Sequence, residues 1–163
     1  MKEICITEDL VWDTLNGLTA FIIPGPDVYS IAQGISAPEP GGVDAGLAEL
    51  LMTTCHLSQP SSSPSPTAVA VAGLLNGLAQ KINPSPSGEF ASPFACLSFG
   101  EKAAVFSFLE KYPATAGSFE LSALVLFVQT ALAYSEMADF ILQPSTPAEW
   151  HMGWAAWRHA GVC

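Results

Sequence analysis

The chain has 163 residues, half of them hydrophobic and only 12% charged, and its 15 acidic and 5 basic residues give a formal net charge of −10. This length favours a single domain over residues 1–163 with one sizeable core. The few basic residues are scattered, which excludes nucleic acid as a partner and disfavours anionic membrane surfaces, because both are bound by clustered Lys and Arg.

The N-terminal residues and the cysteines bear on the compartment. Residues 1–6 carry no basic region followed by an apolar core and no twin-arginine pair, so no export signal is visible. A cytoplasmic location is therefore favoured, with export alongside a partner as the alternative. The cysteines show no CxxC spacing, which argues against a zinc site and a redox motif and favours free thiols over two disulfides. They are Cys5, Cys55, Cys96 and Cys163.

The first predicted helix begins after Thr7, whose hydroxyl can accept a hydrogen bond from a free backbone N–H, and it ends before Pro24. Glu8 and Asp9 complement the positive end of its dipole. Its apolar stripe follows spacings of four, three and four residues, which is typical of one helix face. The stripe consists of Val11, Leu15, Leu18 and Ile22.

Two further helices are predicted over residues 43–56 and 67–82. The inner face of the first consists of Val43, Leu47, Leu50 and Thr54, widened by Leu51 and Cys55. The inner face of the second consists of Val71, Leu74, Leu78 and Ile82, and Asn83-Pro84 ends this helix. Three segments rich in Pro, Ser and Gly, at residues 25–42, 58–66 and 84–96, are predicted to be loops.

Three more helices are predicted in the second half of the chain. One begins with a capping box from Ser98 to Glu101 and ends before Pro113. The next, over residues 118–138, is apolar on most sides, which predicts the centre of a bundle, and its apolar stretch is too short to cross a bilayer. The last runs from Thr146 to Gly161. No segment alternates like a half-buried strand, so the predicted fold is all-α, about six helices with long loops that suit wrapping around a partner.

Few residues are arranged for chemistry. Glu136 and Asp139 stand three residues apart and could divide acid and base work, although a solvated helix end explains them more simply. His151 and His159 stand eight residues apart and cannot chelate one metal ion without a third element. The sequence has no GxSxG turn and no phosphate loop. We therefore predict no catalytic, cofactor-binding or metal-binding residue in this chain.

Three tryptophans are the predicted partner contact. Trp150, Trp154 and Trp157 follow spacings of four and three residues and form one ridge on the last predicted helix. Core packing accounts for two of them as well as an interface does, but three indoles on one short helix would overfill the seam of a small bundle. We therefore predict that the ridge fills a pocket of a partner protein, with stacking on a flat ligand as the alternative.

Four segments together resemble a known family. They are Phe21 to Gly25, Ala37 to Val43, Ala45 to Leu51 and Pro93 to Lys102. Their order resembles the small subunits that accompany FAD-dependent dehydrogenases of the glucose-methanol-choline type, namely the gluconate 2-dehydrogenase third-subunit family and its actinobacterial relatives. The resemblance covers residues 7–140. It does not extend to the tryptophan helix, so no partner contact is borrowed for that helix.

The resemblance implies a division of labour between two chains. FAD, the substrate pocket and the catalytic histidine would belong to a large partner subunit that acts on an alcohol, sugar or sterol hydroxyl. This chain would be the non-catalytic small subunit that binds and stabilises the large one and assists its maturation. Two alternatives stay open: a free-standing helical binding or scaffold module without a flavoenzyme partner, and an independent helical enzyme that uses Glu136 and Asp139.

Overall fold

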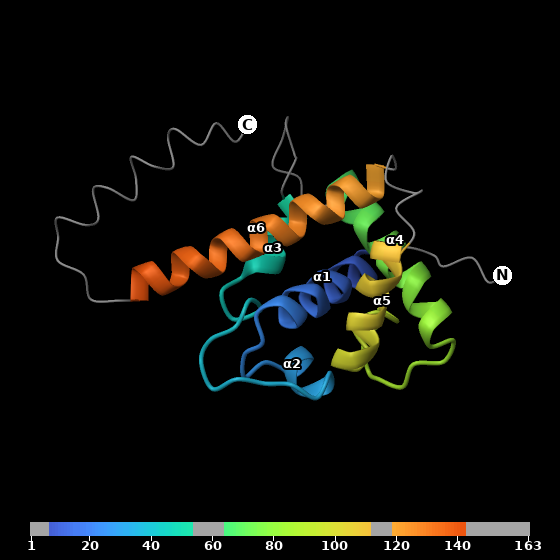
Figure 1. The fold of residues 1–163 in the computed structure, drawn as a ribbon, viewed down its shortest axis with the longest axis horizontal. Helices are drawn as coiled ribbons and strands as arrows, with labels where there is room; N and C mark the ends of the chain where they lie inside the picture. The colour runs from blue at the N-terminus through green and yellow to red at the C-terminus, as the bar shows by residue number, and fades with distance from the viewer. Residues whose placement is uncertain (1–6, 54–63, 112–118, 143–163) are drawn as a thin grey trace. The chain divides into compact units, whose positions relative to one another are not determined.

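The computed structural model describes residues 7–53, 64–111 and 119–142, and within the last range it describes the side chains of residues 121–133 (Figure 1). This part of the chain contains six helices and no strand, which confirms the all-α class. The helices are α1 (Glu8–Ile22), α2 (Val28–Ala32), α3 (Leu47–Thr53), α4 (Pro66–Ile82), α5 (Phe99–Lys111) and α6 (Phe119–Leu142). The helix predicted over residues 146–161 lies outside the described residues.

The chain divides into two compact units, residues 1–132 and residues 133–163. The described helices belong to the first unit, except that residues 133–142 continue α6 in the second. The prediction of one domain over residues 1–163 stays a prediction.

Helix α1 begins as the sequence predicts. Its first turn is capped by Thr7, whose Oγ1 accepts a hydrogen bond from the Leu10 N–H at 3.3 Å. The predicted apolar stripe is confirmed, because Val11, Leu15 and Leu18 are buried and Ile22 packs against the same cluster. This stripe makes α1 the helix around which the core of the first unit is assembled.

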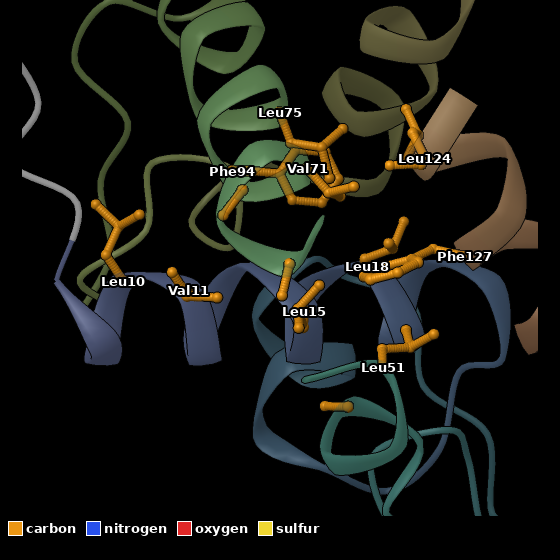
Figure 2. Close-up of a cluster of buried hydrophobic side chains, with 14 of the residues drawn as sticks. Leu10, Val11, Leu15, Leu18, Leu51, Val71, Leu75, Phe94, Leu124 and Phe127 are labelled. Atoms are coloured by element: carbon orange, nitrogen blue, oxygen red, sulfur yellow. The ribbon is translucent and has the colours of Figure 1, made fainter. Parts of the chain in front are cut away.

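The core around α1 contains side chains from α3, α4, α5 and α6. Helices α2, α3 and α4 contact α1, and α5 contacts α4. Figure 2 shows the labelled members of this cluster beside the stripe of α1. The larger contributors from outside α1 are Leu51 of α3, Val71 and Leu75 of α4, Phe94, Val105 of α5, and Leu124 and Phe127 of α6.

Helix α3 begins later than predicted. Gly46 has a φ of +69°, so residues 43–46 form a turn and the helix begins at Leu47. The face that packs inward consists of Leu47, Ala48, Leu51 and Met52, whereas Leu50 is 43% exposed. The predicted inner face is therefore wrong at Leu50, whereas Val43 precedes the helix and packs, partly buried, against Ala20, Tyr29 and Ala95. Its last members, Thr54 and Cys55, lie outside the described residues.

The junction between α4 and α5 follows local capping rules. Ser65 caps α4 by accepting a hydrogen bond from the Ala68 N–H at 3.1 Å. The capping box of α5 is confirmed: the Ser98 N–H donates to Glu101 Oε2 at 2.9 Å and the Glu101 N–H donates to Ser98 Oγ at 3.4 Å. Asn83 Nδ2, at the end of α4, donates to Glu101 Oε1 at 2.9 Å. The hydrogen bonds that the Glu101 carboxylate accepts, first from the Ser98 N–H, then from the Ser98 hydroxyl and from Asn83, lower the pKa of Glu101.

Helix α6 does not occupy the centre of the unit. Among its described side chains Ala123, Leu124, Phe127 and Ala131 are buried, whereas Val125, Leu126 and Leu132 are exposed. The prediction of a central, fully covered helix is therefore wrong for this stretch, because α6 buries one face only. None of the helices in the described ranges is long and apolar enough to cross a membrane.

Candidate functional site on helix α2

The site residues predicted from the sequence cannot be compared with the structure. Trp150, Trp154 and Trp157, together with His151 and His159, lie outside the described residues. Glu136 and Asp139 belong to α6, where only the backbone is described at these positions, so their side chains are also outside the described part. The partner contact and the acid–base pair therefore stay predictions.

Helix α2 lies within residues 25–42, which the sequence predicts to be a loop, so that prediction is wrong in this part. The helix has five residues and an inverted pattern of burial: Tyr29 and Ser30 are buried, whereas Val28 is 63% and Ile31 62% exposed. Gly34, with a φ of +88°, ends the element, and Ile35 beyond it is again exposed. We call Val28, Ile31 and Ile35 the α2 surface. Its apolar side chains are directed outward because polar side chains hold the inner face.

The N-terminal end of α2 is held by two carboxylates. Asp27 Oδ1 accepts hydrogen bonds from the N–H groups of Tyr29 and Ser30, each at 2.9 Å, and Asp27 Oδ2 accepts one from Ser30 Oγ at 2.7 Å. The Tyr29 hydroxyl donates to Asp13 Oδ1 of α1 at 2.6 Å, and its ring stacks on Phe90 at a centroid distance of 4.3 Å. Burial, with the contacts to Asp13, raises the pKa of Tyr29 well above its usual range. Tyr29 therefore stays a neutral donor.

The C-terminal end of α2 is held by Gln33, which is buried. The Gln33 side-chain Nε2 donates to the Ala20 carbonyl of α1 at 2.8 Å, and the Gln33 backbone carbonyl accepts a hydrogen bond from the Phe99 N–H at 2.9 Å. Lys102 Nζ of α5 donates to Gln33 Oε1 at 2.9 Å. These three bonds attach the end of α2 to both α1 and the start of α5.

Lys102 is fully buried, and its ammonium meets neutral partners. In addition to the bond to Gln33, Nζ donates to the Gly17 carbonyl at 3.2 Å and lies 5.5 Å from the centre of the Phe94 ring. Burial lowers the pKa of Lys102 to about 8, and the negative charge of Asp27 opposes that shift. A buried ammonium without a facing carboxylate is unusual in a protein interior.

A close backbone crossing supports the loop that carries α2. A Cβ on Gly25 would lie 2.4 Å from the Gly41 nitrogen, and a Cβ on Gly41 would lie 2.5 Å from the Gly25 nitrogen. Only glycine fits at both positions. At this crossing Asp44 Oδ2 accepts a hydrogen bond from the Gly41 N–H at 3.0 Å and lies beside Gly25, two residues before the N-cap Asp27. The α2 surface is therefore bordered by negative charge at its N-terminal end.

A second polar cluster, formed by Thr14, Asn76 and Ser92, is buried between α1, α4 and the segment before α5. Asn76 Nδ2 donates to Thr14 Oγ1 at 2.8 Å, and Ser92 Oγ donates to Asn76 Oδ1 at 2.8 Å. The Phe94 N–H donates to the same Asn76 oxygen at 3.0 Å. The hydrogen bonds of this cluster reach hydroxyl, amide and backbone groups and include no histidine or carboxylate, so the cluster is not arranged to activate a nucleophile.

Cys96 is a half-buried free thiol, and the other cysteines lie outside the described residues. Its Sγ donates to the Phe90 carbonyl at 3.5 Å, and burial raises its pKa above the usual value. In the described part of the chain no three His, Cys, Asp or Glu side chains are grouped to hold a metal ion.

Sequence reasoning missed the α2 site although two signals were present. Asp27 follows Pro-Gly-Pro and precedes Val-Tyr-Ser-Ile, which is an N-cap position, but five residues are too few to show a helical period. Lys102 stands three residues before Val105, so the two share one face of the helix predicted to begin with the Ser98–Glu101 capping box. A lysine on an otherwise apolar helix face is the signal of a buried cation.

Comparisons with known proteins give no match, whether against protein-family models, curated proteins or solved structures.

Proposed function

We propose that this chain is a non-catalytic small subunit that binds and stabilises a large FAD-dependent oxidoreductase subunit and assists its maturation, with the α2 surface as a contact. The observation that carries the proposal is the exposure of Val28 and Ile31 on a helix whose polar groups are directed inward. Exposed apolar side chains that are held in a fixed position are characteristic of partner surfaces.

The segments that carry the family resemblance surround this surface. Phe21 to Gly25 and Ala37 to Val43 meet at the crossing of Gly25 and Gly41, on the two sides of α2. Pro93 to Lys102 contributes Phe94, Phe99 and the Lys102 ammonium that hold Gln33. Residues in three of the four segments thus help to position α2, which favours a shared role in presenting this helix.

The chemistry of the α2 surface indicates the kind of groove that fits it. An apolar groove would cover Val28 and Ile31, and Lys or Arg at its rim would face the acidic border formed by Asp27 and Asp44. The same acidic border disfavours pairing of two copies through this surface, because like charges would meet. FAD would be bound by the large subunit, which acts on an alcohol, sugar or sterol hydroxyl, and Trp150, Trp154 and Trp157 would extend the contact as this chain wraps around it.

The test is purification of the tagged full chain from its native source, with flavin absorbance measured per mole of chain. The wild-type chain is expected to retain a large flavin-containing subunit. The double variant Val28→Lys, Ile31→Lys is expected to retain about tenfold less flavin, since truncating or charging an interface anchor costs ~2 kcal/mol or more. Gln80→Lys is the matched control, because Gln80 is exposed on α4, away from the sites described above.

Two results would contradict the proposal. One is a wild-type chain that purifies without flavoprotein as a monodisperse monomer, which would favour a free-standing binding or scaffold module. The other is a double variant that retains as much flavin as Gln80→Lys, which would remove α2 from the interface. A large loss of turnover per bound flavin on replacing Glu136 or Asp139 would instead assign chemistry to this chain.

A further inference from the structure

The ammonium of Lys102 is the one charged group among the fully buried side chains in the described part of the chain. Burying such a group without an opposite charge disfavours folding, and an apolar side chain of similar length would avoid this cost. The position of Lys102 therefore requires a different explanation from core packing. Its two hydrogen-bond acceptors, the Gly17 carbonyl and Gln33 Oε1, provide that explanation.

Lys102 determines which way the Gln33 amide is turned. A lysine side chain in its charged form only donates hydrogen bonds, so Gln33 must present its oxygen to Nζ. The Nε2 group is then directed to the Ala20 carbonyl of α1, where it donates at 2.8 Å. One lysine thus fixes both ends of the amide, and through them the end of α2.

We propose that Lys102 is a positioning residue for the α2 surface, which it holds in its outward-facing orientation through Gln33. The positioning itself is independent of the partner, whereas its effect on binding rests on the proposed function. The role depends on N–H donors and not on the charge, because a neutral lysine amine still has two N–H groups for the Gly17 and Gln33 oxygens. Removal of the donors is therefore the informative change.

The test is amide hydrogen exchange of the full chain, with Lys102→Met compared with Val105→Ala. Val105 is fully buried on the same helix, so its truncation weakens the core without touching Gln33. In Lys102→Met the amides of Gln33, Gly34 and Ile35 are expected to exchange about tenfold faster, or more, relative to those of Leu15 and Leu18 in α1. In Val105→Ala all of these amides should accelerate by one common factor.

A double-mutant cycle shows whether Lys102 acts through Gln33. Gln33→Met should accelerate exchange of the same amides at positions 33 to 35, at the end of α2. The variant carrying both changes should exchange no faster there than the stronger single variant. Gln33→Met also keeps the test available if Lys102→Met does not fold. Lys102→Gln, which retains an N–H donor, should restore protection of α2 to within about threefold of the wild type.

The proposal fails if Lys102→Met accelerates α2 and α1 amides by the same factor, or if the effects of the two single changes multiply in the double variant. In the purification assay Lys102→Met should lose flavin as Val28→Lys, Ile31→Lys does, and Val105→Ala should not. If the wild-type chain retains no flavoprotein, the proposed function is wrong, and the exchange data still decide the role of Lys102.

Discussion

At the scale of single residues, burial makes the charged form of Lys102 less favourable in the folded chain than in the unfolded one. Its pKa falls from the ordinary 10.5 to about 8. Between these two values the unfolded chain binds a proton that the folded chain has released, so stability gains from rising pH. The contribution of Lys102 to the free energy of unfolding should therefore increase between about pH 8 and 10.5, by up to about 3 kcal/mol.

The measurement is urea denaturation of the wild type and of Lys102→Met across that pH range. Tyr29 and Cys96 act in the opposite direction: their pKa values are raised by burial, so the folded chain keeps protons that the unfolded chain loses. Both groups are present in the wild type and in the variant, so the difference between the two proteins reports chiefly on Lys102. A difference that stays constant from neutral pH upward would contradict the lowered pKa.

At the scale of elements, the crossing of Gly25 and Gly41 predicts opposite effects for two glycine substitutions. Gly25→Ala places a Cβ 2.4 Å from a backbone nitrogen, so it should lower the free energy of unfolding by ~2 kcal/mol or more. Gly77→Ala, in the interior of α4, meets nothing within 4 Å and should raise that free energy by ~0.5–1 kcal/mol.

Thermal unfolding of both glycine variants, followed by circular dichroism, checks this pair of effects. The sign is decisive, because both changes add the same methyl group and differ only in what surrounds it. Equal effects of the two changes would mean that the backbones at residues 25 and 41 do not approach as described.

Local signals account for the elements that the sequence predicted well. Thr7 and the Ser98–Glu101 capping box set the beginnings of α1 and α5 by contacts within one turn, so short sequence windows contain the whole cause. Helix α2 has a local cap in Asp27, but its inward-facing side chains Tyr29 and Gln33 bond to Asp13 and Lys102 in distant parts of the chain. The prediction of a fully covered α6 is wrong for a related reason, because its composition does not indicate which apolar face the core covers.

At the scale of the whole molecule, the chain has exposed apolar side chains, and half of its residues are hydrophobic, which predicts low solubility without a partner. The isolated chain should self-associate or unfold in part, and co-expression with the large subunit should increase its soluble yield, because a partner that binds only the folded form stabilises it. Size-exclusion chromatography of the chain alone and of the co-expressed pair is the measurement.

In the same experiment the variant Val28→Lys, Ile31→Lys should be more soluble alone and should gain less from co-expression. A wild-type chain that is monomeric and unfolds cooperatively without any partner would contradict the expectation. The sequence could predict that such a chain needs a covered surface, because composition is a property of the whole molecule. It could not place that surface on α2, because the placement follows from hydrogen bonds between distant residues.

The cluster of Thr14, Asn76 and Ser92 also has a consequence for the order in which the chain folds. Thr14 and Ser92 are separated by 78 residues, and Thr14 and Asn76 by 62. These bonds join residues far apart in the sequence and need α1 and α4 to be packed, so we expect them to form late in folding. Disrupting Asn76 should therefore hasten unfolding while leaving the rate of refolding nearly unchanged. The cluster is therefore expected to slow unfolding without changing the rate of folding.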